Sequence, residues 1–127
     1  RAKSDFISNE LWNNQVSMVA ILEPKQVSSK LNEYAQRLKV RGFLHGDSPN
    51  SHIWLFWKDY VSVDMLSASD QSLTTRITIG NQVIIFSFIY AKCDAQAREP
   101  LWRELDAVNP DDAPWLVGGD FNIIASP

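Results

Sequence analysis

The sequence contains a single cysteine, Cys93, and this scarcity excludes two kinds of structure. One cysteine can form neither an internal disulfide nor a multi-cysteine zinc site, so we expect a structural role for Cys93 in a reducing compartment. The two histidines, His45 and His52, are seven positions apart with no cysteine near either. We therefore expect them on strands or at the surface, rather than as a zinc pair.

The sequence also has fewer basic residues than acidic ones. Twelve Lys and Arg residues against 15 Asp and Glu give a net charge of −3, so the chain lacks the basic signature of a typical nucleic-acid-binding domain. A carboxylate site for a divalent cation is itself acidic before metal and substrate bind, so the charge does not exclude such a site. No apolar run approaches the roughly 20 residues that span a bilayer, and we expect no membrane partner.

The length of 127 residues allows one modest domain, which at this size buries roughly two thirds of the surface of its unfolded chain. Apolar residues make up 45% of the sequence, as in a folded globular protein. The first residue is not methionine, and the chain stops shortly after a glycine-rich turn without a closing element. We therefore expect residues 1–127 to form a single partial domain, truncated at both ends.

Apolar periodicity predicts helices alternating with strands. Helical spacing occurs in three segments, at 3–15, 28–41 and 100–108. Ser28 or Ser29 would cap the second helix and Gly42 would end it. Strand patterns occur at 18–22, 53–57, 61–65, 73–79, 83–90 and 115–117. Strand 53–57 is apolar on both faces, which predicts an interior strand, and 73–90 reads as a hairpin around a Gly-Asn turn. This order predicts a layered α/β or α+β domain.

Two carboxylates directly follow apolar strands, where a rigid scaffold presents functional groups. Glu23 follows the first predicted strand and Asp120 follows the last. Hard cations bind a few carboxylate oxygens and keep positions for water and phosphate, so the pair suits Mg2+, with Mn2+ as a substitute. A charge in a turn is usually only solvated, and for Glu23 that interpretation stands. At Asp120, Gly118 and Gly119 would let the backbone approach a ligand, and Asn122 adds an amide.

Polar residues after the hairpin have two interpretations each. Tyr90 ends a strand and could direct its phenol at a phosphate, although an aromatic residue that ends a buried strand is more often core. Lys92 and Arg98 in the following loop could contact phosphate, but exposed basic residues in loops are usually solvated. No physical argument separates Gln71 and Asp94 from other solvated loop residues.

Several short motifs occur in the order found in a known group of nucleases. They are Leu22-Glu23-Pro24-Lys25, Ile53-Trp54-Leu55-Phe56-Trp57, Tyr90-Ala91-Lys92-Cys93, Leu101-Trp102 and Pro114-Trp115-Leu116-Val117-Gly118-Gly119-Asp120-Phe121-Asn122. The sequence thus resembles the endonucleases of plant non-LTR (LINE-type) retrotransposons, within the endonuclease/exonuclease/phosphatase superfamily. Gly-Asp-Phe-Asn after a strand is specific to the superfamily. The tryptophan-rich segments and Tyr-Ala-Lys-Cys narrow the resemblance to the plant retrotransposon group.

The resemblance implies a four-layer fold, in which two packed β-sheets are flanked by helices, and Mg2+-dependent cleavage of phosphodiester bonds in DNA. It implies that Glu23 ligates the metal, that Tyr90 lies near the scissile phosphate, that Asp120 orients or deprotonates the attacking water and that Asn122 helps to hold the phosphate. The implied product is a nick in target DNA whose free 3′ hydroxyl primes a reverse transcriptase encoded downstream. A DNA substrate would place the protein in the nucleus.

The chain departs from the family pattern at both ends. The family's first asparagine motif would precede Arg1, and its closing Ser-Asp-His motif would follow Pro127, while neither His45 nor His52 matches the catalytic histidine. With half of the family's domain absent, we expect the second sheet to be missing and an apolar face to be exposed. We therefore expect the isolated chain to be unstable and inactive by itself.

Two other interpretations stay open. One is a superfamily activity on a different phosphoester, such as that of a phosphatase, a sphingomyelinase-like enzyme or a deadenylase. The other is an inactive retroelement remnant that binds metal or nucleic acid weakly at most. The coding sequence after Pro127 distinguishes an active retroelement endonuclease from the remnant, because the first continues into a Ser-Asp-His segment and a reverse transcriptase and the second runs into stop codons.

Overall fold

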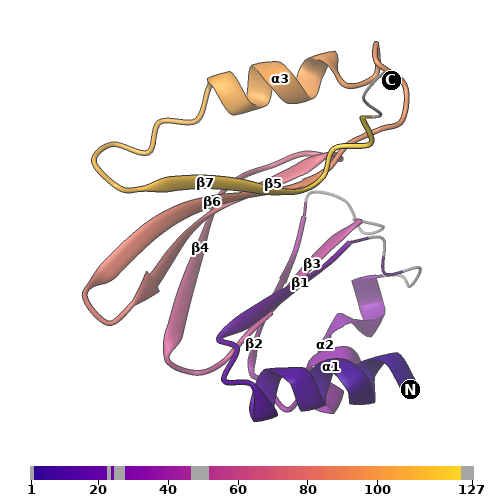
Figure 1. Cartoon of the computed structure of the whole chain (residues 1–127), viewed down its shortest axis with the longest axis vertical. Coiled ribbons are helices and arrows are strands. Elements are labelled where there is room, and N and C mark those ends of the chain that lie inside the picture. Colours follow the sequence, from indigo (N-terminus) through magenta and orange to yellow (C-terminus); the bar gives the residue numbers. More distant parts are fainter. Residues whose placement is uncertain (1, 23, 25–27, 47–51, 124–127) are drawn as a thin grey trace.

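A computed structural model describes residues 2–22, 24, 28–46 and 52–123 of the chain (Figure 1). The helices and strands follow in the order α1 (Ala2–Asn13), β1 (Met18–Leu22), the 3-10 turn η1 (Ser28–Lys30), α2 (Leu31–Leu38), β2 (Gly42–His45), β3 (Ile53–Trp57), β4 (Val61–Ala68), β5 (Ser72–Ile79), β6 (Gln82–Tyr90), α3 (Glu99–Asp106) and β7 (Trp115–Asp120). The predicted alternation of helices and strands is confirmed, and the short strand β2 is an addition to it.

The elements form four layers. One sheet has the strand order β1-β3-β2 and is antiparallel throughout, and the other has the order β4-β5-β6-β7, in which β6 and β7 run parallel. Helices α1 and α2 cover the outer face of the first sheet, and α3 lies over the outer face of the second (Figure 1). The predicted sandwich of two sheets flanked by helices is confirmed.

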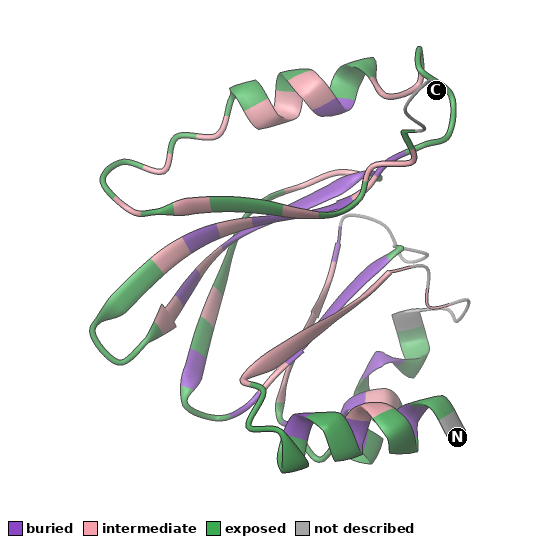
Figure 2. Cartoon of the chain, in the orientation of Figure 1, coloured by how far each residue is buried: buried purple, intermediate pink, exposed green. Residues whose placement is uncertain are grey.

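Strand β3 is the centre of the first sheet because it is apolar on both faces. Trp54 and Phe56 pack against the helices, in a cluster with Leu11 of α1 and Leu38 of α2. The alternate residue Leu55 packs into the core between the two sheets. All of these side chains are almost fully buried, and Figure 2 colours most of β3 as buried. Burying a side chain of this size contributes about 1.5–3 kcal/mol, so this strand ties two layers of the core together.

The predicted ends of the second helix are wrong. The residue before α2 is Lys30, and no side chain caps the helix there, so neither Ser28 nor Ser29 is the cap. The helix ends at Leu38, and the C-cap residue Lys39 adopts the left-handed conformation with φ 63°. Gly42 instead opens β2, where a Cβ would overlap the indole of Trp57. This glycine is required by close packing in the sheet rather than by the end of a helix.

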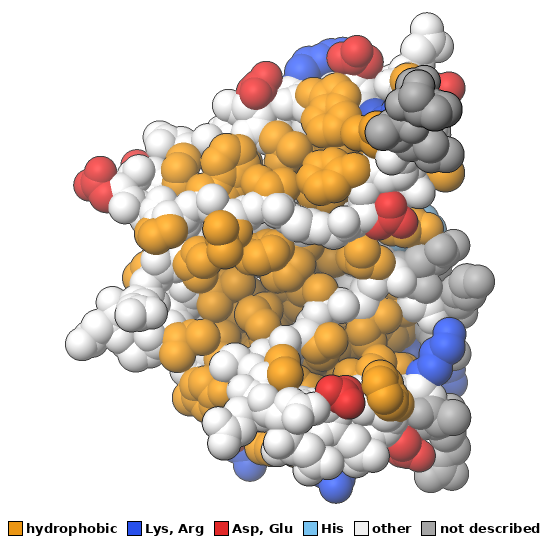
Figure 3. Space-filling view, in the orientation of Figure 1, with side chains coloured by type: hydrophobic (Ala, Val, Ile, Leu, Met, Phe, Trp, Pro, Cys, Tyr) orange, Lys and Arg blue, Asp and Glu red, His pale blue; other side chains and the backbone are white. Residues whose placement is uncertain are grey.

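The expectation that the second sheet would be missing is wrong, because both sheets are present. What remains open is the side of the sandwich where β1 and β7 are edge strands. Hydrophobic side chains gather between these two strands (Figure 3). Apolar residues of the inter-sheet core there, such as Met18 and Phe86, are only partly buried, and Leu116 of β7 is 50% exposed.

No helix in the described part of the chain is long and apolar enough to cross a membrane.

This open side predicts that the isolated chain is unstable and self-associates. The purified chain should bind a hydrophobic dye such as ANS and elute at a larger size as its concentration rises, because edge strands with apolar neighbours pair with other chains. Leu116→Lys should reduce this association. Phe6→Lys is the matched control, since Phe6 is 64% exposed on α1, away from β7. A monomer with a single cooperative thermal transition would contradict the prediction.

Candidate active site

Tyr90 and Asp120 lie side by side at the ends of two parallel strands. Tyr90 is the last residue of β6, Asp120 is the last residue of β7, and the two are partners in the register of the sheet. Partners on adjacent strands project from the same face, so both side chains belong to the face that looks toward the first sheet. The pairing continues by one more bond, because the Ala91 N–H donates to the Asp120 carbonyl at 2.8 Å.

Asn122 is tied to both strand ends. Its backbone N–H donates to Asp120 Oδ1 at 2.9 Å, an Asx turn in which Asn122 adopts φ 50°. Its side-chain Nδ2 donates to the Ala91 carbonyl, which follows β6, at 2.5 Å. These contacts fix the orientation of the carboxamide and leave Oδ1 and one Nδ2 hydrogen without a hydrogen-bond partner among the described residues.

The strand β7 runs through the glycines, which corrects the expected glycine-rich turn after residue 117. Gly119 has φ 140° and lies so close to β6 that a Cβ would overlap the backbone of Ile89. The structure thus gives Gly119 a role within the sheet, while the approach of its backbone to a ligand stays a prediction. Its close approach is to the neighbouring strand, and it brings Asp120 into register with Tyr90.

Arg98 is a brace rather than the solvated loop residue expected from its position. Its Nη1 donates to three carbonyls, those of Lys92 at 3.1 Å, Cys93 at 2.7 Å and Asn122 at 3.1 Å. A charged donor makes these bonds stronger than neutral ones. The guanidinium thus joins the loop after β6 to the segment after β7, and it holds the two halves of the site together.

The end of β6 and the segment after β7 border a pocket of about 210 Å3, which Asp120 itself does not line. Its walls include Tyr90 and Asn122, and the remaining lining residues are His52, Asp70, Ala91, Lys92 and Cys93. Lys92 and Asp70 form an ion pair of 2.8 Å at the surface, which contributes little to stability. A larger apolar pocket of about 430 Å3 lies at the other end of β6 and has no titratable side chain in its lining, so we place the site at the smaller one.

His52 is a site residue that sequence reasoning missed. Its ring lies 5.3 Å from that of Tyr90, and it precedes Ile53, the partner of Leu22 at the end of β1. The end of β1 in one sheet therefore lies near the end of β6 in the other. Glu23, the predicted metal ligand, follows β1 but lies outside the described residues, so its role stays a prediction.

The described side chains provide an incomplete but suitable donor set for a hard cation. No cluster of three His, Cys, Asp or Glu side chains that could hold a metal occurs between residues 2 and 123, outside the gaps in the description. Asp120 is exposed and keeps Oδ2 without a hydrogen-bond partner among the described residues, and the oxygen of the Asn122 amide is also available. These oxygens fit a Mg2+ ion that keeps water and substrate ligands, rather than one in a closed protein cage.

Solved structures share this architecture. No family model matches the chain, and no curated protein matches it in sequence. A humanized tyrosyl-DNA phosphodiesterase 2 (TDP2) from D. rerio aligns over 97% of this chain and 56% of its own, with a TM-score of 0.71 and 14% identity. The D. rerio TDP2 complexed with single strand DNA product aligns over 97% and 54%, with a TM-score of 0.70 and 13% identity. A truncated Caenorhabditis elegans TDP2 aligns over 97% and 56%, with a TM-score of 0.63 and 13% identity.

TDP2 belongs to the endonuclease/exonuclease/phosphatase superfamily. The chain has the fold of this superfamily. It spans a little over half the length of the D. rerio structures. At these low identities the likeness concerns the superfamily fold alone, and it carries no evidence for a retrotransposon origin.

Adding a methyl group at Gly119 tests how the superfamily fold positions Asp120 in this chain. Gly119→Ala should destabilise the protein by about 1–3 kcal/mol, because the new Cβ overlaps the Ile89 backbone at a φ that favours glycine. Gly118→Ala is the matched control, since its Cβ would meet only the ring of Phe86 at 3.2 Å, which can shift slightly. Chemical denaturation measures both variants. Equal stabilities for the two would show that the close strand approach is not a constraint.

Proposed function

We propose that this chain forms part of a divalent-metal-dependent phosphodiesterase that hydrolyses DNA. The observation that carries the proposal is the pairing of Tyr90 with Asp120 in register, with Asn122 bonded to the backbone of one strand end and the carboxylate of the other. A carboxylate, a phenol and a carboxamide converging beside a pocket offer a base and hydrogen-bond donors to a phosphate. The D. rerio TDP2 structure with a single strand DNA product, which has the same fold, supports DNA as the substrate.

Four side chains would divide the chemistry among them. Asp120 Oδ2 is available to accept a proton from the attacking water, while Oδ1 stays bonded to the Asn122 N–H. The second hydrogen of Asn122 Nδ2 and the Tyr90 hydroxyl would donate to phosphate oxygens. Glu23 would hold a Mg2+ ion, which supplies charge neutralisation at the phosphate when bound.

The more specific form of the proposal is a nick in target DNA that primes reverse transcription. Its support is the resemblance of the motifs around Tyr90, of strand β3 and of the segment 114–122 to plant retrotransposon endonucleases. A reverse transcriptase encoded downstream would then be the functional partner. A nuclear location follows from the DNA substrate, and another phosphoester substrate or an inactive remnant are the alternatives.

A nicking assay on supercoiled plasmid in Mg2+ tests the proposal. It compares this chain, a version extended downstream through the implied Ser-Asp-His motif, and Asp120→Asn in the extended version. We expect nicking by the extended version only. We expect Asp120→Asn to reduce the rate by about 100- to 10,000-fold, the usual contribution of a catalytic acid or base.

Asp112→Asn is the matched control for this assay. Asp112 is exposed in the loop before β7, and removing its charge should leave nicking unchanged. A folded extended version that does not nick DNA in Mg2+ or Mn2+ would contradict the endonuclease proposal. The extended version could instead cleave another phosphoester and lose this activity in Asp120→Asn. That result would support the proposed site and show that DNA is not its substrate.

A further inference from the structure

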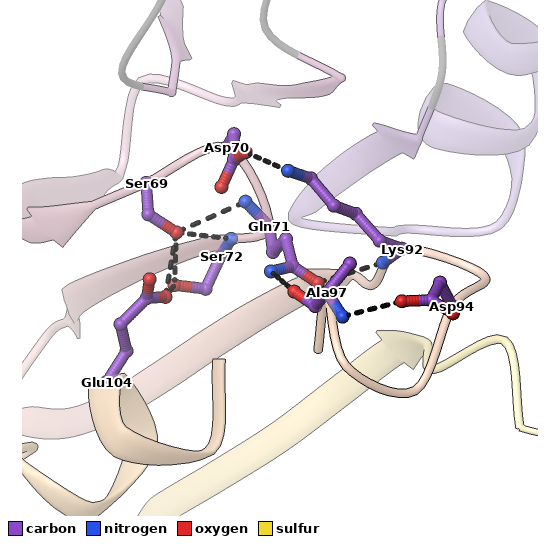
Figure 4. A network of polar contacts seen from close by, with 8 residues as sticks. All are labelled: Ser69, Asp70, Gln71, Ser72, Lys92, Asp94, Ala97 and Glu104. Atoms are coloured by element: carbon purple, nitrogen blue, oxygen red, sulfur yellow. Dashed lines mark hydrogen bonds and ion pairs between the residues drawn. The ribbon is translucent and has the colours of Figure 1, made fainter. Parts of the chain in front are cut away.

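The turn between β4 and β5 carries a buried side chain that reaches the candidate site. Gln71 is 1% exposed, although it lies in a turn between two strands. Its Oε1 accepts the N–H of Lys92 at 2.8 Å, and its Nε2 donates to the carbonyl of Ala97 at 2.9 Å (Figure 4). Its backbone carbonyl also accepts the N–H of Tyr90 at 2.8 Å. One residue therefore contacts the end of β6 and both ends of the loop that follows it.

The turn that holds Gln71 is itself anchored. Ser69 and Ser72 both donate through their hydroxyls to Glu104 Oε2 of α3, at 2.7 and 2.9 Å. Ser69 Oγ also accepts the N–H of Gln71 at 3.1 Å (Figure 4). These bonds to α3 fix the position of the turn. The Gln71 side chain therefore binds the loop after β6 from a fixed position.

The contact with Lys92 has a consequence for Asn122. The N–H of Lys92 and the carbonyl of Ala91 belong to one planar peptide group, and no described peptide bond is cis. Gln71 Oε1 accepts from the N–H side of this group, and Asn122 Nδ2 donates to its carbonyl side. A trans peptide directs these two groups in opposite directions, so the peptide is clamped between the two carboxamides.

We propose that Gln71 is a positioning residue, which orients the Asn122 carboxamide through the Ala91–Lys92 peptide. With the peptide plane fixed by Gln71, the Ala91 carbonyl oxygen accepts Asn122 Nδ2 from a fixed position, and this favours one orientation of the Asn122 carboxamide at the pocket. Hydrogen bonds in such a chain polarise and strengthen one another. This inference rests on the proposed phosphodiesterase function only for its catalytic consequence, since the clamp itself is a structural feature.

The first test measures the clamp without activity. Gln71→Met keeps the volume of the side chain but removes both of its side-chain hydrogen bonds. In NMR spectra of the chain and of the extended version, it should move the side-chain amide signals of Asn122 toward those of a free carboxamide. Gln96→Met is the matched control, because Gln96 is an exposed glutamine in the same loop, and it should leave these signals in place. Unchanged Asn122 signals in Gln71→Met would overturn the proposal.

A second variant tests the same contacts from the Asn122 side. The proposal thus stays testable even if Gln71→Met does not fold. Asn122→Ala removes the donor to the Ala91 carbonyl at the partly exposed end of the chain of bonds. The Lys92 amide and Gln71 side-chain signals should then shift together, because the peptide that joins them loses one of its two anchors. Lys92 and Gln71 signals that stay in place would count against coupling through this peptide.

The catalytic consequence is tested by a double-mutant cycle in the nicking assay. Gln71→Met should lower kcat by up to about 100-fold with little change in KM, the size expected when a catalytic group is misplaced. Adding it to Asn122→Ala should cause no further loss, because both changes act on the same group. Independent, multiplying losses would overturn the positioning role. If no version nicks DNA, the proposed function fails, while the NMR signals still decide the clamp.

Discussion

The parallel pairing of β6 with β7 is the constraint on which the candidate site depends. Asp120 lies 30 positions after Tyr90 in the sequence, and only the register of these two strands makes them neighbours. Gly119 sets how closely the strands approach, and α3, which connects them, packs on the outer face of the same sheet through Leu101. Parallel strands normally occur in sheets that are covered on both faces. Here β7 is also an edge, so the strand that carries Asp120 has support on one side only.

Polar contacts compensate for this one-sided support. Arg98 joins the loop after β6 to the Asn122 backbone, and Gln71 joins the same loop to the turn before β5. Both residues bond mainly to backbone groups, and so they fix the path of the chain, whatever side chains the loop carries. The rigid part of the site is therefore a frame of backbone and amide groups, while Asp120 remains exposed and available to a cation or to water.

The sequence was sufficient to predict the four layers of the fold. It was not sufficient to predict the hydrogen bonds that fix the loops around the site. Strand β3 was predictable because its alternate residues are all large and apolar, and the hairpin because two strand patterns flank Gly80. Strand β2 was missed because four residues are too few to show a period. Arg98 and Gln71 looked like solvated loop residues, since their partners lie up to 26 positions away and only the folded chain brings them together. Tyr90, Asp120 and Asn122 were predicted as site residues through the motif resemblance and the glycines, and Gly119 also sets how closely β7 approaches β6.

The central claim is that the ends of β6 and β7 form the edge of a site for a divalent cation. Paramagnetic broadening of backbone NMR signals by Mn2+ tests it most directly, because the effect falls off steeply with distance from the ion. At substoichiometric Mn2+ the signals of residues 90–93 and 120–122 should broaden first, and Asp120→Asn should remove this selectivity. Broadening that instead centres on the exposed Asp111 and Asp112, or that is unchanged by Asp120→Asn, would contradict the account.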